Sequence, residues 1–438
     1  MTSLLHAARS SRRSFGLAVG AATLCLFAPR AARSLEESRA ALAPGSAARP
    51  VLVCLFLRGA ADGLSLVVPH GEGEYYKARP RIAIARPGQT DGAVALDERF
   101  GLHPRLGPLA AAYRGGELAI VHAVGSPHAT RSHFEAQDYM ETGMPGQVIS
   151  EGWLGRYLQA QRPLAEPSSD ELRAVALGHG TPLALRGYPG VVSAPRLRAF
   201  ALRAPRGLRR PLERAFLRMY DEDRGNAAPE REPLRDGDQL LRTGHDALTA
   251  ARRLRKLGLA QYQPEHGATY SKENEALRDV AAVIKADVGL EVAWLDIGGW
   301  DTHQNQGNGD TGRLARSLAP WGAGLAAFRA DLGARFEHVL VLVLTEFGRT
   351  LRENGSGGTD HGHGSAMLLL GGRVQGGKVY GRWPGLEPAA LWEGRDLAVT
   401  TDYRDVYSEV ATGFLGQGDV SRILPGHPAG PALGLFRS

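Results

Sequence analysis

The segment from Leu290 to Gln306, L-E-V-A-W-L-D-I-G-G-W-D-T-H-Q-N-Q, decides the fold. Its first half is apolar and rich in strand-forming residues, which is typical of a buried strand that ends at the Gly298-Gly299 pair. Asp301 and His303 follow directly. Ligands of α/β proteins bind at the carboxyl ends of the strands. A strand that ends in glycines and then presents a carboxylate and an imidazole therefore predicts a site.

Two other segments have the same character. Residues 51–57 form an apolar run that leads to Asp62, and residues 339–345 lead to Glu346 and Arg349. We expect the three strand ends to lie together, because parallel strands end at the same edge of a sheet.

The order of the elements predicts an α/β fold with a doubly wound, mostly parallel sheet and helices on both faces. Residues 64–68 are expected to continue the first strand after a bend, and a helix is expected from His103 to Tyr113 before a strand at 118–123. A helical insert is expected at about 195–285 within a domain that spans residues 50–438. Acids interleave the arginines of this insert, which indicates a solvated face and no nucleic-acid partner.

The N-terminus resembles an export signal. Residues 1–33 contain S-R-R-S-F-G-L, which is similar to the twin-arginine motif, and an apolar run too short for a transmembrane span. The leader holds five arginines and no acid, so its removal lowers the formal charge from +6 to +1. We expect a linker at 34–49 and a periplasmic or extracellular protein, exported by the twin-arginine machinery, with no transmembrane span in the mature chain. Cys54 would be the one remaining cysteine, which excludes a disulfide framework.

A helix is predicted to start near Ser132. Ser132 and Glu135 have the spacing of a capping box, and the helix should end near Gly143. Its N-terminal N–H groups and dipole would favour an anion. Ser132 is either a simple N-cap or a nucleophile whose developing oxyanion faces those N–H groups, and His133 beside it is a candidate catalytic residue.

Carboxylates and imidazoles gather at the predicted strand ends and in one Gly-rich loop. Converging on one crevice, they suit a divalent metal such as Zn²⁺ or Mn²⁺, with one or two ions bound. Arg349 and Arg131 would either clamp an oxyanion or form surface ion pairs. His122 is expected to be a core residue, and Trp300 a packing residue at the crevice wall. The candidate metal ligands are Asp62, Asp301, His303, Glu346, His361 and His363, and Asp360 lies beside them.

Five motifs, in this order behind the leader, resemble the exported bacterial family DUF1501: F-L-R-G-A-A-D-G-L, H-A-T-R-S-H-F-E-A-Q-D, W-D-T-H, T-E-F-G-R-T and G-T-D-H-G-H-G. The resemblance covers nearly all of the chain from Val51 onward. That family is similar to the alkaline phosphatase-like superfamily, which includes sulfatases and usually binds two metals.

The resemblance implies that Ser132 is the nucleophile and that Asp62, Glu346 and the Asp and His residues at 301, 303 and 361 or 363 are metal ligands. Phe347 stands where the superfamily has a histidine, which implies one metal or none. The leading hypothesis is an exported metal-dependent hydrolase of a phosphate or sulfate ester, small or polymer-borne. The alternative is a catalytically degenerate binding protein that uses the same crevice.

Overall fold

The computed structural model describes residues 49–161, 172–178, 180–199, 249–250, 252–428 and 430–437, with positions 208, 211–212 and 215. The chain divides into two units, Met1–Ser34 with Arg198–Lys256, and Leu35–Leu197 with Leu257–Ser438. The second unit contains the sheet and the site, and is the one described below. The expected export signal, almost all of the linker and about half of the expected helical insert lie outside the described residues.

A nine-stranded sheet forms the centre of this unit, in the order β11-β5-β10-β9-β1-β8-β6-β7, with β12 also beside β5. The central strand β1 is parallel to both β8 and β9. Among these strands, β10 alone is antiparallel to its neighbours. The strands are β1 (Val51–Leu57), β5 (Leu118–Gly125), β6 (Ala174–Leu177), β7 (Val191–Ser193), β8 (Val292–Ile297), β9 (Val339–Leu344), β10 (Ser365–Gly371), β11 (Lys378–Tyr380) and β12 (Thr401–Asp402).

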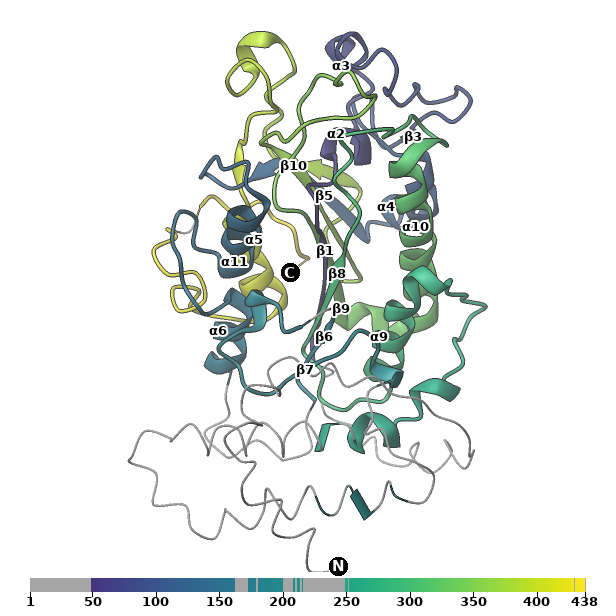
Figure 1. The fold of residues 1–438 in the computed structure, drawn as a ribbon, viewed down its shortest axis with the longest axis vertical. Coiled ribbons are helices and arrows are strands. Elements are labelled where there is room, and N and C mark those ends of the chain that lie inside the picture. Colours follow the sequence, from purple (N-terminus) through teal and green to yellow (C-terminus); the bar gives the residue numbers. More distant parts are fainter. Residues whose placement is uncertain are drawn as a thin grey trace, which may run out of the picture. The chain divides into compact units, whose positions relative to one another are not determined.

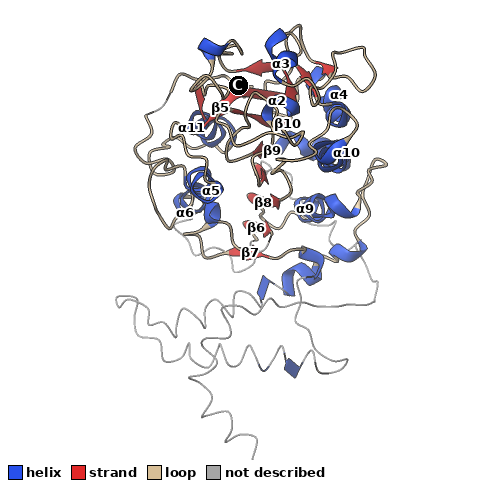
Figure 2. Cartoon of the chain, turned by 45° about the horizontal axis from the view of Figure 1, so that its top comes forward, coloured by secondary structure: helices blue, strands red, loops and turns tan. Residues whose placement is uncertain are grey.

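Helices cover both faces of the sheet, which confirms the predicted fold class (Figure 1). On one face lie α5 (His133–Thr142), α6 (Trp153–Ala160) and α11 (Tyr403–Glu409), and on the other α4 (Ala110–Arg114), α9 (Glu275–Lys285) and α10 (Gly312–Leu332). Figure 2 shows the strands between these two layers. Every residue of β1 and β9 is buried, because such apolar runs pack on both faces of a parallel sheet.

Aromatic side chains fill the core between the sheet and the first helical layer. Trp153 of α6 stacks on Tyr407 of α11, with ring centroids 4.3 Å apart. Phe56 of β1 stacks on Trp294 of β8 at 5.7 Å. Each of these four rings is buried, and burying one large aromatic contributes about 1.5–3 kcal/mol. The packing fixes the strand ends from which the site is built.

One local prediction was wrong and another was confirmed. Residues 64–68 form the short helix α2 (Gly63–Leu66) and then β2 (Val67–Val68), because the carbonyl of Asp62 accepts the N–H groups of residues 65 and 66 and closes a turn. The helix expected from residue 103 is confirmed: it starts after His103 as a 3₁₀ segment over Pro104–Leu109 and continues as α4.

The remaining elements are peripheral. β2, β3 (Val94–Ala95) and β4 (Gly101–Leu102) form a small antiparallel sheet near α3 (Gly73–Ala78). A π-helical segment (Val410–Phe414) extends α11. Short 3₁₀ segments occur at Leu183–Leu185, Leu197–Ala199, Leu259–Gln261, Lys272–Asn274, Gly333–His338 and Pro388–Ala390. None of the helices within the described ranges has the length and apolar character needed to cross a membrane.

Candidate metal centre

The ends of β1, β8 and β9 meet around the guanidinium of Arg349. This side chain is buried and donates hydrogen bonds to the carbonyls of Gly59 and Ala60 after β1, to Thr359 of the Gly-rich loop, and to the carboxylate of Asp301 after β8. The sequence left two roles for Arg349, an oxyanion clamp or a surface ion pair. The structure shows a third: a buried anchor that ties the strand ends together and orients Asp301.

Three histidines surround Asp301. The Nε2 of His303 lies 3.0 Å from Asp301 Oδ1, and the Nε2 of His361 lies 3.4 Å from the same oxygen. The Nε2 of His133, from the first turn of α5, lies 3.8 Å from Oδ2. We call these four residues the histidine cluster. It joins the helix start, the end of β8 and the Gly-rich loop at one point.

The other ring nitrogen of each histidine is held by an oxygen acceptor. Nδ1 of His133 contacts Glu346 Oε1 at 2.8 Å, and Nδ1 of His303 contacts Asp360 Oδ1 at 2.9 Å. Nδ1 of His361 contacts the carbonyl oxygen of residue 131 at 2.9 Å. Donation from Nδ1 to these acceptors leaves the lone pair of each Nε2 directed at the cluster. Metal-binding histidines in proteins are oriented in this way.

The cluster fits a divalent cation. The Nε2 of His133 is buried and has no hydrogen-bond partner among the described residues. The Nε2 atoms of His303 and His361 are 3.0 Å apart, and two lone pairs at that distance require a cation or proton between them. Ligand atoms of His133, Asp301 and His361 all lie within 4.8 Å of one another. Three imidazoles and one carboxylate suit Zn²⁺, Mn²⁺ or a similar ion.

Electrostatics keep the two carboxylates of this region ionised. Burial would raise the pKa of Asp301, but the hydrogen bond and charge of Arg349 outweigh it and lower the pKa. Burial would likewise raise the pKa of Glu346, and the hydrogen bonds from His133 and Gln137 lower it instead. Burial lowers the pKa of His361. Each shift favours the protonation state that a metal ligand or its supporting acceptor needs.

Glu346 contacts the cluster through His133 and not as a direct member of it. Besides His133, its Oε1 accepts hydrogen bonds from Gln137 Nε2 at 2.9 Å and from the N–H of Gly59 at 2.8 Å. Sequence reasoning missed Gln137. It lies four residues after His133 on the predicted helix, so the shared helix face was a usable signal.

The structure keeps Asp62 away from the cluster. Arg79 makes a bidentate ion pair with both Asp62 oxygens, and the side chains of Ser65 and Gln306 donate to Oδ2. Burial would raise the pKa of Asp62, and the Arg79 charge lowers it. The metal-ligand role expected of Asp62 does not fit this geometry, because a guanidinium already occupies the place of a cation.

His363 also lies apart from the cluster. Its ring packs on Trp392, with centroids 5.0 Å apart, and burial lowers its pKa. Of the two histidines that the sequence left open, the structure therefore brings His361 to Asp301. Phe347 stacks on His133 at 5.0 Å and contacts His361 at 5.1 Å, so it forms the apolar wall of the cluster.

Ser132 precedes α5, as predicted, but its hydroxyl does not cap the helix. Glu135 instead accepts a hydrogen bond from Thr130 Oγ1 at 2.6 Å. Arg131 is an exposed ion-pairing residue, bound to Glu393 and Asp396. The Ser132 hydroxyl is thus available beside His133, while the Arg131 side chain is already paired.

His122 and Trp300 have the packing roles expected of them. His122 is buried, its Nε2 lies 3.0 Å from the carbonyl of Val67, and its Nδ1 accepts the N–H of Ala123. Trp300 is 1% exposed. Neither contributes an atom to the histidine cluster.

A comparison with solved structures found only distant similarity. Ps i-CgsB in complex with k-i-k-neocarrahexaose has a TM-score of 0.37 and 11% identity, over 86% of this chain and 74% of that one. A mutant of TAB5 alkaline phosphatase with bound Mg has a TM-score of 0.29 and 10% identity, over 74% of this chain and 90% of that one. No curated protein matches the sequence. A family model described as a protein of unknown function, DUF1501, matches residues 49–418, and the chain therefore belongs to the DUF1501 family.

Proposed function

We propose that the protein is a metal-dependent hydrolase of phosphate or sulfate esters. His133, Asp301, His303 and His361 would hold one divalent ion, Zn²⁺ or Mn²⁺. The observation that carries the proposal is the convergence of three imidazole Nε2 atoms on Asp301 while each Nδ1 is held by an acceptor. When bound, such an ion would polarise a phosphoryl or sulfuryl oxygen and acidify a nearby hydroxyl or water.

The chain's own residues supply the rest of the chemistry. Glu346 fixes the tautomer and orientation of His133, and Arg349 holds Asp301 ionised and in place. Ser132 is the proposed nucleophile, since its hydroxyl is not used as a helix cap and it lies at the start of α5. The first N–H groups of that helix would favour the negative charge that develops on the substrate.

The proposal includes an extracytoplasmic site of action. The leader of residues 1–33 resembles a twin-arginine signal, which typically exports proteins already folded. A metal loaded before export would be consistent with that route. The substrate would then be an ester outside the cytoplasm, either a small molecule or a group on a polymer.

The test is turnover of 4-nitrophenyl phosphate and 4-nitrophenyl sulfate by purified protein loaded with Zn²⁺ or Mn²⁺. We expect turnover by wild type and by the His363→Ala control, and none by His133→Ala or Ser132→Ala. Full activity of Ser132→Ala would refute the nucleophile assignment. Stoichiometric metal with no turnover of either ester would support a binding protein that uses the same residues.

A further inference from the structure

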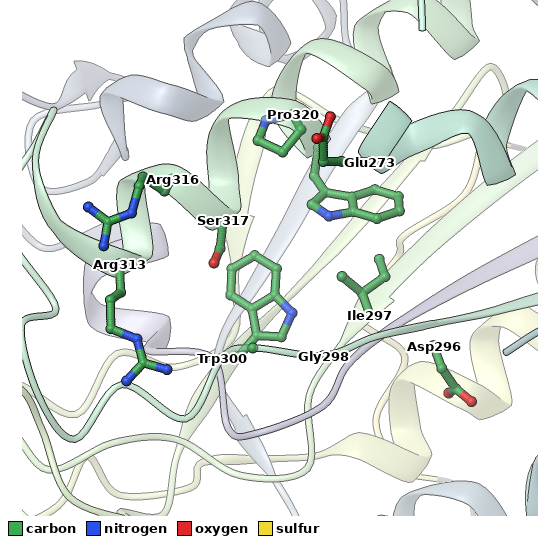
Figure 3. Close-up of a pocket in the computed structure, with 11 residues that line it drawn as sticks. Glu273, Asp296, Ile297, Gly298, Trp300, Arg313, Arg316, Ser317 and Pro320 are labelled. Carbon is green, nitrogen blue, oxygen red and sulfur yellow. The ribbon is translucent and has the colours of Figure 1, made fainter. Parts of the chain in front are cut away.

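A cavity of about 560 Å³ opens at the carboxyl end of β8 (Figure 3). Gly298 and Gly299 line it, and a Cβ added to either would meet no atom within 4 Å. The main chain is therefore open to a ligand at this point. Trp300 forms part of the wall, and the next residue is Asp301 of the histidine cluster.

One side of the cavity is cationic. Arg313 and Arg316 lie three residues apart on α10, so they share one face of the helix, and both line the cavity (Figure 3). Neither guanidinium has an ion pair or hydrogen bond with any residue that the structure describes. Two uncommitted guanidinium groups on one wall suit an anionic group such as a sulfate, phosphate or carboxylate.

Apolar side chains line the cavity beside these arginines. Ile297 and Trp321 supply this surface. The carboxylate of Asp296 points to the other face of the sheet, where its Oδ1 accepts hydrogen bonds from Arg58 Nε at 2.8 Å and Trp294 Nε1 at 2.9 Å.

We propose that this cavity binds an anionic sugar unit. Arg313 and Arg316 would hold its charged group, and Trp321 would pack against its ring. The inference deepens the proposed function and rests on it: the ester would be carried by an anionic saccharide, with the reacting group at the histidine cluster.

The test is the quenching of tryptophan fluorescence on titration with glucose 6-sulfate, with glucose and inorganic sulfate as comparators. Wild type treated with EDTA and the Asp301→Asn variant are used, so that neither metal nor turnover contributes. We expect saturable binding of glucose 6-sulfate, weakened about tenfold or more in the Arg313→Gln/Arg316→Gln double variant. The control Arg114→Gln, an exposed arginine of α4 outside the cavity, should bind as wild type does.

Unchanged binding in the double variant, or no binding by wild type, would overturn the inference. Sulfate or glucose bound as tightly as glucose 6-sulfate would also overturn it, because the cavity would then recognise only one half of the ligand. A different result would contradict the proposed function alone. Binding by Asp301→Asn without any ester turnover by metal-loaded wild type would leave the cavity assignment intact and remove the hydrolase assignment.

Discussion

Replacing Glu346 with glutamine should weaken metal binding without unfolding the protein. The carboxylate is 1% exposed, and its Oε1 accepts hydrogen bonds from His133, Gln137 and the N–H of Gly59. Glutamine keeps the shape and can keep an oxygen toward these donors, while its amide group can donate to Thr345 Oγ1. The negative charge behind His133 is lost, however, and the imidazole becomes a weaker ligand.

The expected loss is about 10- to 100-fold in metal affinity, or about 1.4–2.7 kcal/mol. The assay is competition between the protein and a fluorescent chelator for Zn²⁺, with circular dichroism as the check on folding. Asp360→Asn is the matched comparator, because Asp360 holds His303 in the same way but is 54% exposed at its side chain. Solvent screening limits its effect to about fivefold. Glu346→Gln within about twofold of wild type, or a larger loss in Asp360→Asn, would refute the reasoning.

Three further predictions concern stability and backbone geometry. Asp62→Asn should cost about 3–5 kcal/mol in urea unfolding at pH 7, because it leaves a buried guanidinium unpaired; a loss below about 1 kcal/mol would contradict this. Burial lowers the pKa of His122 to about 4. As the pH falls, this histidine therefore becomes protonated in the unfolded chain before it does in the folded chain. The free energy of unfolding should reach its full value above about pH 6.5 and be about 2 kcal/mol lower at pH 5, and this decrease should be absent from His122→Gln. An equal pH dependence of the unfolding free energy in the two proteins would count against the prediction. Gly59→Ala should weaken metal binding about tenfold or more, since Gly59 has φ +116° and its Cβ would lie 2.6 Å from the Asp301 nitrogen. Gly298→Ala, whose Cβ meets open space, is the control, and equal affinities in the two variants would refute the geometry.

The sequence was most informative where one physical requirement dominates. The apolar runs of β1, β8 and β9 are buried along almost their whole length, so hydrophobicity alone identified them. The prediction failed where local hydrogen bonding competes with the hydrophobic pattern, as at α2, where Asp62 closes a turn.

The site was harder to predict because its membership depends on contacts between distant segments. The sequence could not show that Arg79, seventeen residues after Asp62, is buried against it. The choice between His361 and His363 depends on the course of the Gly-rich loop, which brings Arg349 and His361 into a β-bridge. The motifs identified the residue types, and only the fold separates those that meet from those that do not.

The most direct test of the account is the metal content of protein purified without chelators, measured by mass spectrometry for wild type, His133→Ala and His363→Ala. We expect close to one divalent ion per chain in wild type and His363→Ala, and little or none in His133→Ala. Folded wild type without metal, or His133→Ala that retains it while His363→Ala does not, would contradict the account.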